Sequence, residues 1–419
     1  MTTRRDFLQQ SSLLGFGASV PAFLGRTAFA APTADKKGAK DTVLVVIQLT
    51  GGNDGLNTVI PYKNDEYYKI RPTLAIPKDQ VKGIGKDLGF HPAFDAMARL
   101  HNDKSAVCVV QGVGYPNPSQ SHFRSMDIWH GGSTTESLND GWIGKALKAH
   151  PTPAFHLAAG NESSPLALNG APVRVPSVTS LEDFQLKMAS ANGADKAAQK
   201  GVITDVAKGS TPGANTPGSP VNLLDFVART QLNTYASSDK LAAIGKNYQP
   251  KVPYPATAFG NRLKLAAQLI DANLGARIFY VSLDGFDTHA GQGGAVGAHA
   301  NLLQTISDGI SALYRDLAER GHKDRLCIMT FSEFGRRGYE NGSKGTDHGS
   351  GAPMFLVGGK VKSGIVGEHP SLTKMETGNL IHAIDFRRVY AAVLDQWLGV
   401  DSKTVLGEKH EALELFAKS

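Results

Sequence analysis

The sequence predicts an α/β protein, a three-layer α/β/α sandwich around a mostly parallel sheet. Two observations support this: apolar, β-branched segments recur along the chain, and helical patterns separate them. A continuous apolar run is typical of a strand that is buried on both faces, as in a parallel sheet. Helices then cover both faces. The expected strands are residues 42–49, 106–110, 277–283, 326–331 and 354–357.

Apolar residues at spacings of three and four predict the helices. Leu302, Ile306, Ile310 and Leu313 form such a stripe. The expected helices are residues 91–101, 123–130, 259–274, 298–320 and 386–398.

The composition excludes several classes of protein. The chain has 419 residues, with 44 Lys+Arg, 38 Asp+Glu and 41% hydrophobic residues, as in an ordinary globular protein. Its two cysteines exclude a disulfide scaffold and any Cys-rich metal centre. No apolar run reaches ~18 residues after the N-terminal segment, so no transmembrane helix is expected in the mature chain. Basic residues do not cluster with aromatic ones, so nucleic-acid binding is not expected.

The first 30 residues are typical of an export signal. Arg4 and Arg5 precede Phe-Leu, an apolar stretch follows, and Ala28-Phe29-Ala30 matches an A-x-A cleavage site. We expect a twin-arginine signal peptide, recognised by the twin-arginine export machinery and cleaved after Ala30, and a periplasmic or secreted protein. Cleavage removes three arginines and one aspartate, so the net charge changes from +6 to +6 − 2 = +4. The alternative is an amphipathic helix of the fold.

The mature chain is expected to be a linker, residues 31–40, and one domain, residues 41–419, with an insertion at about 180–250. Residues 190–221 are poor in large apolar side chains and rich in Gly, Ser, Thr and Pro, and a helical pattern follows at 223–246. The insertion is either a lid over a site or a tolerated surface segment.

Acidic and histidine residues follow the predicted strands. Ligands of parallel sheets bind at the carboxyl ends of the strands, so residues just after each apolar run are candidates for a site. Together, five carboxylates and two histidines predict one or two divalent metal ions, Zn²⁺, Mn²⁺, Mg²⁺ or Ca²⁺. The candidate metal ligands are Asp54, Asp284, Asp287, His289, Glu333, Asp347 and His348.

Several of these residues also have purely structural interpretations. Asp54 follows Gly51 and Gly52 and is suited to capping a turn. Glu333 has Arg336 and Arg337 nearby for an ion pair. Asp284 suits either a ligand position or an acceptor that orients His289.

The segment 114–125 precedes a helical pattern and contains Ser119 and Ser121. A serine at a helix N-terminus either caps the helix or lies where free N–H groups bind a phosphoryl or sulfuryl oxygen.

These motifs, in this order, resemble the domain of unknown function 1501 family, which is placed with the alkaline phosphatase and sulfatase-like superfamily. The matching segments lie between about residues 41 and 370. They are Leu49–Gly55, Ser121-His122-Phe123, Gly285–His289, Ser332–Arg336 and Thr346–Gly349.

The resemblance implies an alkaline phosphatase-like fold and a metal site for phosphoryl or sulfuryl transfer. Asp54 would hold one metal, and Asp287 with His289 the other. Glu333 and His348 would fill the remaining ligand positions; in an alternative alignment Asp347-His348 takes the place given to Glu333.

The resemblance also implies catalytic residues. Ser121 and His122 would stand near the nucleophile position, with Arg124 as the partner of the oxyanion. Ser119 and a metal-bound water are the other candidate nucleophiles. The formylglycine motif C/S-x-P-x-R does not follow the first strand, which departs from sulfatases of that type.

We therefore expect an exported metal-dependent hydrolase of phosphate or sulfate esters, acting on a small ester or a polymer. The alternative is a non-catalytic exported binding or structural protein that keeps the fold and a structural metal. A redox enzyme is not favoured, because Gly51-Gly52-Asn53-Asp54-Gly55 does not match G-x-G-x-x-G.

Overall fold

The computed structural model describes residues 41–135, 138–181, 245 and 247–417. Contacts divide the chain into two compact units, Met1–Lys36 with Ser180–Tyr248 and Lys37–Thr179 with Gln249–Ser419. All helices and strands named below belong to the second unit. The expected signal peptide, the linker and almost all of the expected insertion lie outside the described residues, so the boundaries assigned to them stay predictions.

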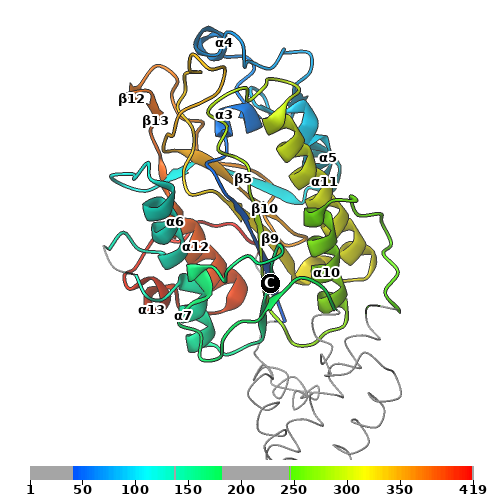
Figure 1. Ribbon diagram of the computed structural model, residues 1–419. Coiled ribbons are helices and arrows are strands. Elements are labelled where there is room, and N and C mark those ends of the chain that lie inside the picture. Colours follow the sequence, from blue (N-terminus) through cyan, green and yellow to red (C-terminus); the bar gives the residue numbers. More distant parts are fainter. Residues whose placement is uncertain (1–40, 136–137, 182–244, 246, 418–419) are drawn as a thin grey trace, which may run out of the picture. The chain divides into compact units, whose positions relative to one another are not determined.

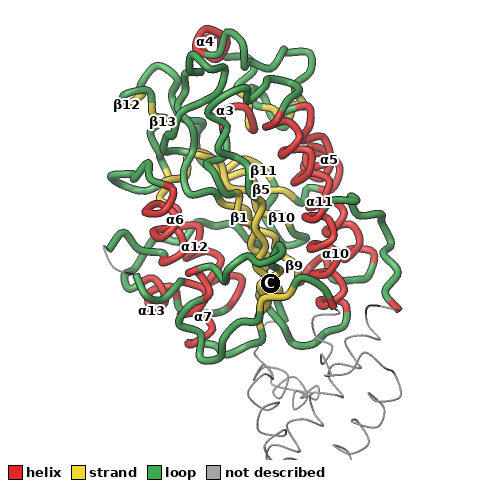
Figure 2. Tube along the Cα trace, viewed as in Figure 1, coloured by secondary structure: helices red, strands yellow, loops and turns green. Residues whose placement is uncertain are grey.

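A mixed sheet forms the centre of the second unit (Figures 1 and 2). Its strand order is β11-β5-β10-β9-β1-β8-β6-β7, and β14 pairs with β5. The strands are β1 (Val43–Leu49), β5 (Val107–Gly114), β6 (Ala154–Leu157), β7 (Ser177–Val178), β8 (Ile278–Leu283), β9 (Leu326–Phe331), β10 (Ala352–Val357), β11 (Gly364–Val366) and β14 (Ile384–Asp385).

The apolar runs form the central strands because both faces of the sheet are covered. Every residue of β1 is buried, and Val45 pairs with Phe279 of β8 on one side and Ile328 of β9 on the other. Both pairings are parallel. The predicted mostly parallel sheet is confirmed.

Strand β10 runs against the direction of its neighbours. It pairs antiparallel with both β5 and β9. Because of this direction, the N-terminal end of β10 lies at the edge formed by the carboxyl ends of β1, β8 and β9. The long connection from β9 to β10, residues 332–351, therefore stays at that edge.

Helices cover both faces of the sheet, as predicted for a three-layer sandwich (Figure 1). On one face α11 (Ala298–Glu319) contacts α5 (Asp95–Lys104) and α10 (Ala258–Asp271). The other face carries α6 (His122–Gly131), α7 (Trp142–Ala149), α12 (Phe386–Ala392), the π-helical turn η5 (Val393–Leu398) and α13 (Ser402–Leu406). A large apolar cluster, which includes Trp129, Trp142 and Tyr390, packs these helices on the sheet.

Short elements complete the unit. They are α3 (Gly55–Thr58), β2 (Val59–Ile60), α4 (Asp65–Ile70), β3 (Lys82–Gly83), β4 (Gly89–Phe90), η1 (Pro92–Phe94), η2 (Leu166–Leu168), η4 (Lys323–Arg325), β12 (Met375–Glu376) and β13 (Asn379–Leu380). The helix predicted at 91–101 begins as the 3-10 turn η1 and continues as α5 to Lys104, where Ser105 ends it with φ 47°.

The search for membrane-spanning helices covered the described residues. Among them, no helix combines the length and apolar character that crossing a bilayer requires.

Candidate functional site

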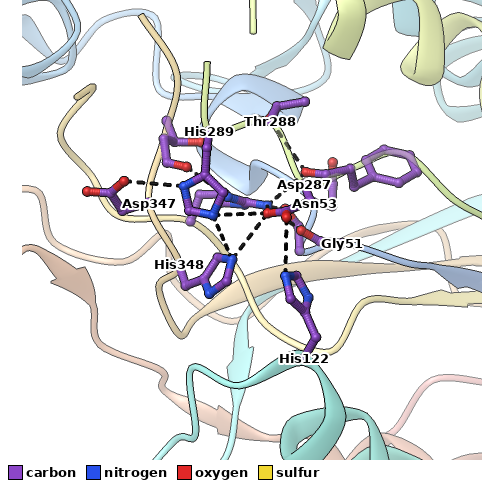
Figure 3. A network of polar contacts seen from close by, with 12 residues as sticks. Gly51, Asn53, His122, Asp287, Thr288, His289, Asp347 and His348 are labelled. Atoms are coloured by element: carbon purple, nitrogen blue, oxygen red, sulfur yellow. Dashed lines mark hydrogen bonds and ion pairs between the residues drawn. The ribbon is translucent and has the colours of Figure 1, made fainter. Parts of the chain in front are cut away.

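Side chains from three segments meet at the edge where the strands β1, β8 and β9 end (Figure 3). His122 is the first residue of α6. Asp287 and His289 lie on the loop after β8, and His348 lies on the connection before β10. The reversed direction of β10 brings His348 to this edge, where it forms an isolated antiparallel bridge with Arg336.

The four side chains converge on one point. Asp287 Oδ1 lies 3.1 Å from both His289 Nε2 and His348 Nε2. These two nitrogens are 2.8 Å apart. Asp287 Oδ2 lies 3.4 Å from His122 Nε2. One ligand atom each from His122, Asp287 and His348 lie within 4.8 Å of one another, the spacing of a candidate metal site.

The other ring nitrogen of each histidine faces a fixed acceptor. Nδ1 of His122 lies 2.8 Å from Glu333 Oε1, and Nδ1 of His348 lies 2.8 Å from the Gln120 carbonyl oxygen. Nδ1 of His289 lies 3.4 Å from Asp347 Oδ1. Carboxylate and carbonyl oxygens accept, so a proton on each Nδ1 satisfies these contacts and leaves a lone pair on Nε2.

Three lone pairs and a carboxylate therefore face one another. Such a set of acceptors is unfavourable unless a cation or additional protons lie among them. Imidazoles that donate Nδ1–H to an oxygen and offer Nε2 inward have the arrangement of metal-binding histidines. His122, Asp287 and His348 fit a divalent cation, and His289 Nε2 lies next to two of these ligands.

Arg336 holds the loops of the site in place. Its guanidinium is buried and donates to the carbonyl oxygens of Gly51, Gly52, Phe286 and Thr346, at 2.7 Å for Gly52 and Thr346. It also donates to Asp287 Oδ1 at 2.6 Å. One side chain of the β9–β10 connection thus fixes the loops after β1 and β8.

The protonation states suit metal binding. Burial would raise the pKa of Asp287, but the hydrogen bond and the charge of Arg336 outweigh it and lower this pKa to about 2. Burial lowers the pKa of His348 below its usual value, although Asp287 and the Gln120 carbonyl oppose the shift. At neutral pH Asp287 is ionised and His348 is neutral, the forms that bind a metal.

Glycine allows the loops to approach closely. Gly51 has φ 118°, and a Cβ there would lie 2.4 Å from the backbone nitrogen of Asp287. Gly345 approaches the loop after β8 just as closely, since a Cβ added there would lie 2.2 Å from the carbonyl carbon of His289. Phe334 packs beside the rings of His122 and His348, with centroids at 4.9 and 4.7 Å.

A family model described as protein of unknown function (DUF1501) matches residues 221–409. This part of the chain is similar to the DUF1501 family. The matched range contains Asp287, His289 and His348, and also Glu333 and Asp347, whose oxygens accept from two of the rings. No curated protein matches the chain significantly.

The chain is also similar to several solved structures. They include the sulfatase PsFucS1 from Pseudoalteromonas sp. (14% identity, TM-score 0.36, 94% of this chain and 75% of that chain covered). The lipoteichoic acid synthase LtaP from Listeria monocytogenes has 10% identity and TM-score 0.30 over 83% of this chain and 71% of its own. The phosphonate monoester hydrolase SpPMH from Silicibacter pomeroyi has 12% identity and TM-score 0.29 over 89% and 78%.

Asp54, a predicted metal ligand, lies in a separate buried ion pair with Arg71. Its Oδ1 accepts from Arg71 Nη2 at 2.9 Å, and its Oδ2 accepts from Arg71 Nη1 and, at 2.6 Å, from Gln292 Nε2. The side chains of Asp54 and Arg71 are fully buried. Burial would raise the pKa of Asp54, but the charge and hydrogen bonds of Arg71 lower it to about 2.

Glu333 and Asp347 support the histidines through their outer nitrogens. Of the two ion pairs considered for Glu333, neither forms: Glu333 bonds to His122, and Arg336 pairs with Asp287. Asp347 accepts from Asn341 Nδ2 at 3.0 Å as well as from His289.

Three further predicted residues have other surroundings. Asp284 is exposed at the end of β8, and its charge acts on Arg262. Arg124 Nη2 donates to the carbonyl oxygens of Thr134 and Thr135, at 2.9 and 2.8 Å, on the loop after α6. Ser121 is the N-cap of α6, and its side chain makes no capping hydrogen bond.

Sequence reasoning did not foresee the role of Arg336 or of the Gln120 carbonyl. Arg336 was considered only as a partner of Glu333. The residue type at a position does not indicate that its backbone carbonyl will orient a histidine ring. For Arg336 the signal was its place five residues after β9, within the same connection as Asp347 and His348.

We predict that Arg336→Lys destabilises the protein strongly. Lysine keeps the charge, but its compact ammonium cannot reproduce the guanidinium fork that reaches four carbonyls and Asp287. Buried carbonyls left unpaired cost about 1–3 kcal/mol each. The free energy of unfolding in urea should fall by about 3 kcal/mol or more. Arg99→Lys, at an exposed pair with Asp95 on α5, should cost less than about 0.5 kcal/mol; equal losses would contradict the assigned role.

We also predict an acid-sensitive contribution from Asp54. Its folded-state pKa of about 2 lies below the ordinary 3.8, so the stability it contributes is present above about pH 4 and is lost as pH falls towards 2. The difference in unfolding free energy between the wild type and Asp54→Asn should therefore shrink over this window. Asp65→Asn, at an exposed carboxylate, is the control and should give a nearly constant difference.

Proposed function

We propose that this protein is an exported metal-dependent hydrolase of phosphate or sulfate esters. The observation that carries the proposal is the convergence of three histidine Nε2 atoms on Asp287, an arrangement that a bound cation would satisfy. The location adds support, because ligands of α/β sheets bind where parallel strands end. The side chains of Asp287 and His289 are 47% and 44% exposed, so a substrate can reach the centre.

The ligand set favours a transition metal. Imidazole nitrogens suit Zn²⁺ and other borderline ions, whereas Mg²⁺ and Ca²⁺ prefer oxygen ligands. When bound, such an ion would stabilise the negative charge that develops on the ester oxygens. Asp287 brings a carboxylate whose charge Arg336 already balances, so the protein part of the centre adds little net charge.

The start of α6 supports binding of an anionic ester group. Helix α6 begins at His122, so the partial positive charge of its N-terminus lies next to a ligand of the metal. We assign the nucleophile to Ser121, whose hydroxyl is free of capping. Ser119 Oγ instead accepts from Ser121 N at 3.3 Å, which gives it a role in holding the loop.

Export is proposed from the N-terminal sequence alone. Arg4-Arg5, the apolar stretch and Ala28-Phe29-Ala30 support twin-arginine export to the periplasm or beyond. We expect N-terminal sequencing of the protein from the extracytoplasmic fraction to begin at Ala31. A full-length, cytoplasmic product in a host with an active twin-arginine system would contradict this.

We expect the purified protein to bind a divalent metal stoichiometrically and to hydrolyse an aryl phosphate or aryl sulfate. His348→Ala removes one converging lone pair and should lower both metal content and turnover at least tenfold. His101→Ala, near the end of α5, is the matched control and should change neither. Elemental analysis and a panel of chromogenic esters provide the measurements.

Further results distinguish between the candidate nucleophiles and between a hydrolase and a non-catalytic binding protein. Ser121→Ala should abolish turnover while the metal stays bound, and turnover retained in this variant would assign the attack to water. Metal-dependent melting without hydrolysis of any ester would favour the non-catalytic binding protein. A native protein without metal would overturn the proposal.

A further inference from the structure

Glu333 is a carboxylate that the fold has removed completely from solvent. Its side chain is 0% exposed. Oε1 accepts from His122 Nδ1 at 2.8 Å and from the backbone nitrogen of Gly51 at 2.9 Å, and Oε2 accepts from Ser332 Oγ at 3.2 Å. The Ser332 hydroxyl also donates to the Leu49 carbonyl oxygen at 2.6 Å, so His122 and Gly51 are the principal donors to this carboxylate.

The carboxylates of this edge differ in how their charge is balanced. Asp54 has the guanidinium of Arg71, and Asp287 has that of Arg336. Among the described residues, the ion pairs within 4 Å give Glu333 one partner, the imidazole of His122. A neutral imidazole donates a hydrogen bond but supplies no full charge. Burying a carboxylate without a counter-charge costs several kcal/mol.

The candidate metal site lies on the opposite side of the His122 ring from Glu333. Nε2 of His122 faces Asp287 and belongs to the candidate metal site, while Nδ1 faces Glu333. A cation on Nε2 polarises the ring and makes Nδ1–H a stronger, charge-assisted donor.

We propose that Glu333 is a positioning residue whose buried charge is neutralised by the metal through His122, so that metal binding and fold stability are coupled at this one carboxylate. The inference rests on the metal site of the proposed function and adds a thermodynamic role for Glu333. Because coupling is reciprocal, the carboxylate strengthens metal binding by as much as the metal stabilises the buried carboxylate.

Removing the charge of Glu333 should affect the melting temperature differently in the metal-free and the metal-bound protein. Glu333→Gln keeps an oxygen that accepts from His122 and Gly51 but removes the charge. Without metal, the variant lacks an uncompensated buried charge and should melt at or above the temperature of the metal-free wild type. With metal, it lacks the charge-assisted bond and should gain less stability. If Glu333 merely held the loop, the substitution would lower stability equally in both states.

The experiment compares wild type, Glu333→Gln and Glu162→Gln after chelation and after addition of Zn²⁺, at pH 8, where an imidazole in water is neutral. Glu162 is the matched control: it accepts from Ser282 Oγ and, at 2.9 Å, from Ala159 N, and it lies 3.7 Å from Arg262 Nη1. Melting temperatures are read by circular dichroism, and the Zn²⁺ dissociation constant is obtained by competition with a chelator.

We expect the Zn²⁺-induced rise in Tm to fall by at least half in Glu333→Gln and the Zn²⁺ dissociation constant to weaken 10–100-fold. Glu162→Gln should lower Tm equally with and without Zn²⁺ and leave the dissociation constant unchanged. A metal-free Glu333→Gln that melts well below the metal-free wild type, or does not fold, overturns the inference and leaves the proposed function intact. A wild type whose Tm does not respond to any divalent metal overturns the metal site, and this inference with it.

Discussion

The buried guanidinium of Arg336 is the interaction on which the rest of the site depends. The loops after β1 and β8 come from distant parts of the sequence, and their carbonyl oxygens point inward at the sheet edge. Without a donor these oxygens would be buried and unpaired, which proteins avoid. Arg336 satisfies carbonyls of both loops, and one of its own connection, while balancing the charge of Asp287.

Charge balance explains how so many acidic and histidine groups share one edge. Asp54 and Asp287 each have an arginine, whereas Glu333 and Asp347 accept from imidazoles. These pairings turn the rings so that Nε2 of three histidines points at Asp287. The charge imbalance that remains is confined to this site, and a divalent cation would relieve it. This connects the polar network to the proposed chemistry.

Sequence patterns predicted the parts of this protein that depend on local composition. The apolar runs became β1, β5, β8, β9 and β10, and the expected parallel centre formed, because strands buried on both faces must be apolar throughout. Acidic and histidine residues after the strands predicted a site at the edge where the parallel strands end, and several of these residues meet there. Asp287, His289 and His348 were among the candidates from their positions alone.

The tertiary structure decided which candidates meet and which partner each one takes. The direction of β10 cannot be read from an apolar run, yet it brings His348 and Asp347 to the edge of the site. The pairing of Asp54 with Arg71, and of Glu333 with His122, depends on side chains distant in sequence. By itself the sequence determined the strands and the polar residues at their ends. Only folding distributed the counter-charges, because a buried carboxylate is stabilised by whichever donor the packing brings to it.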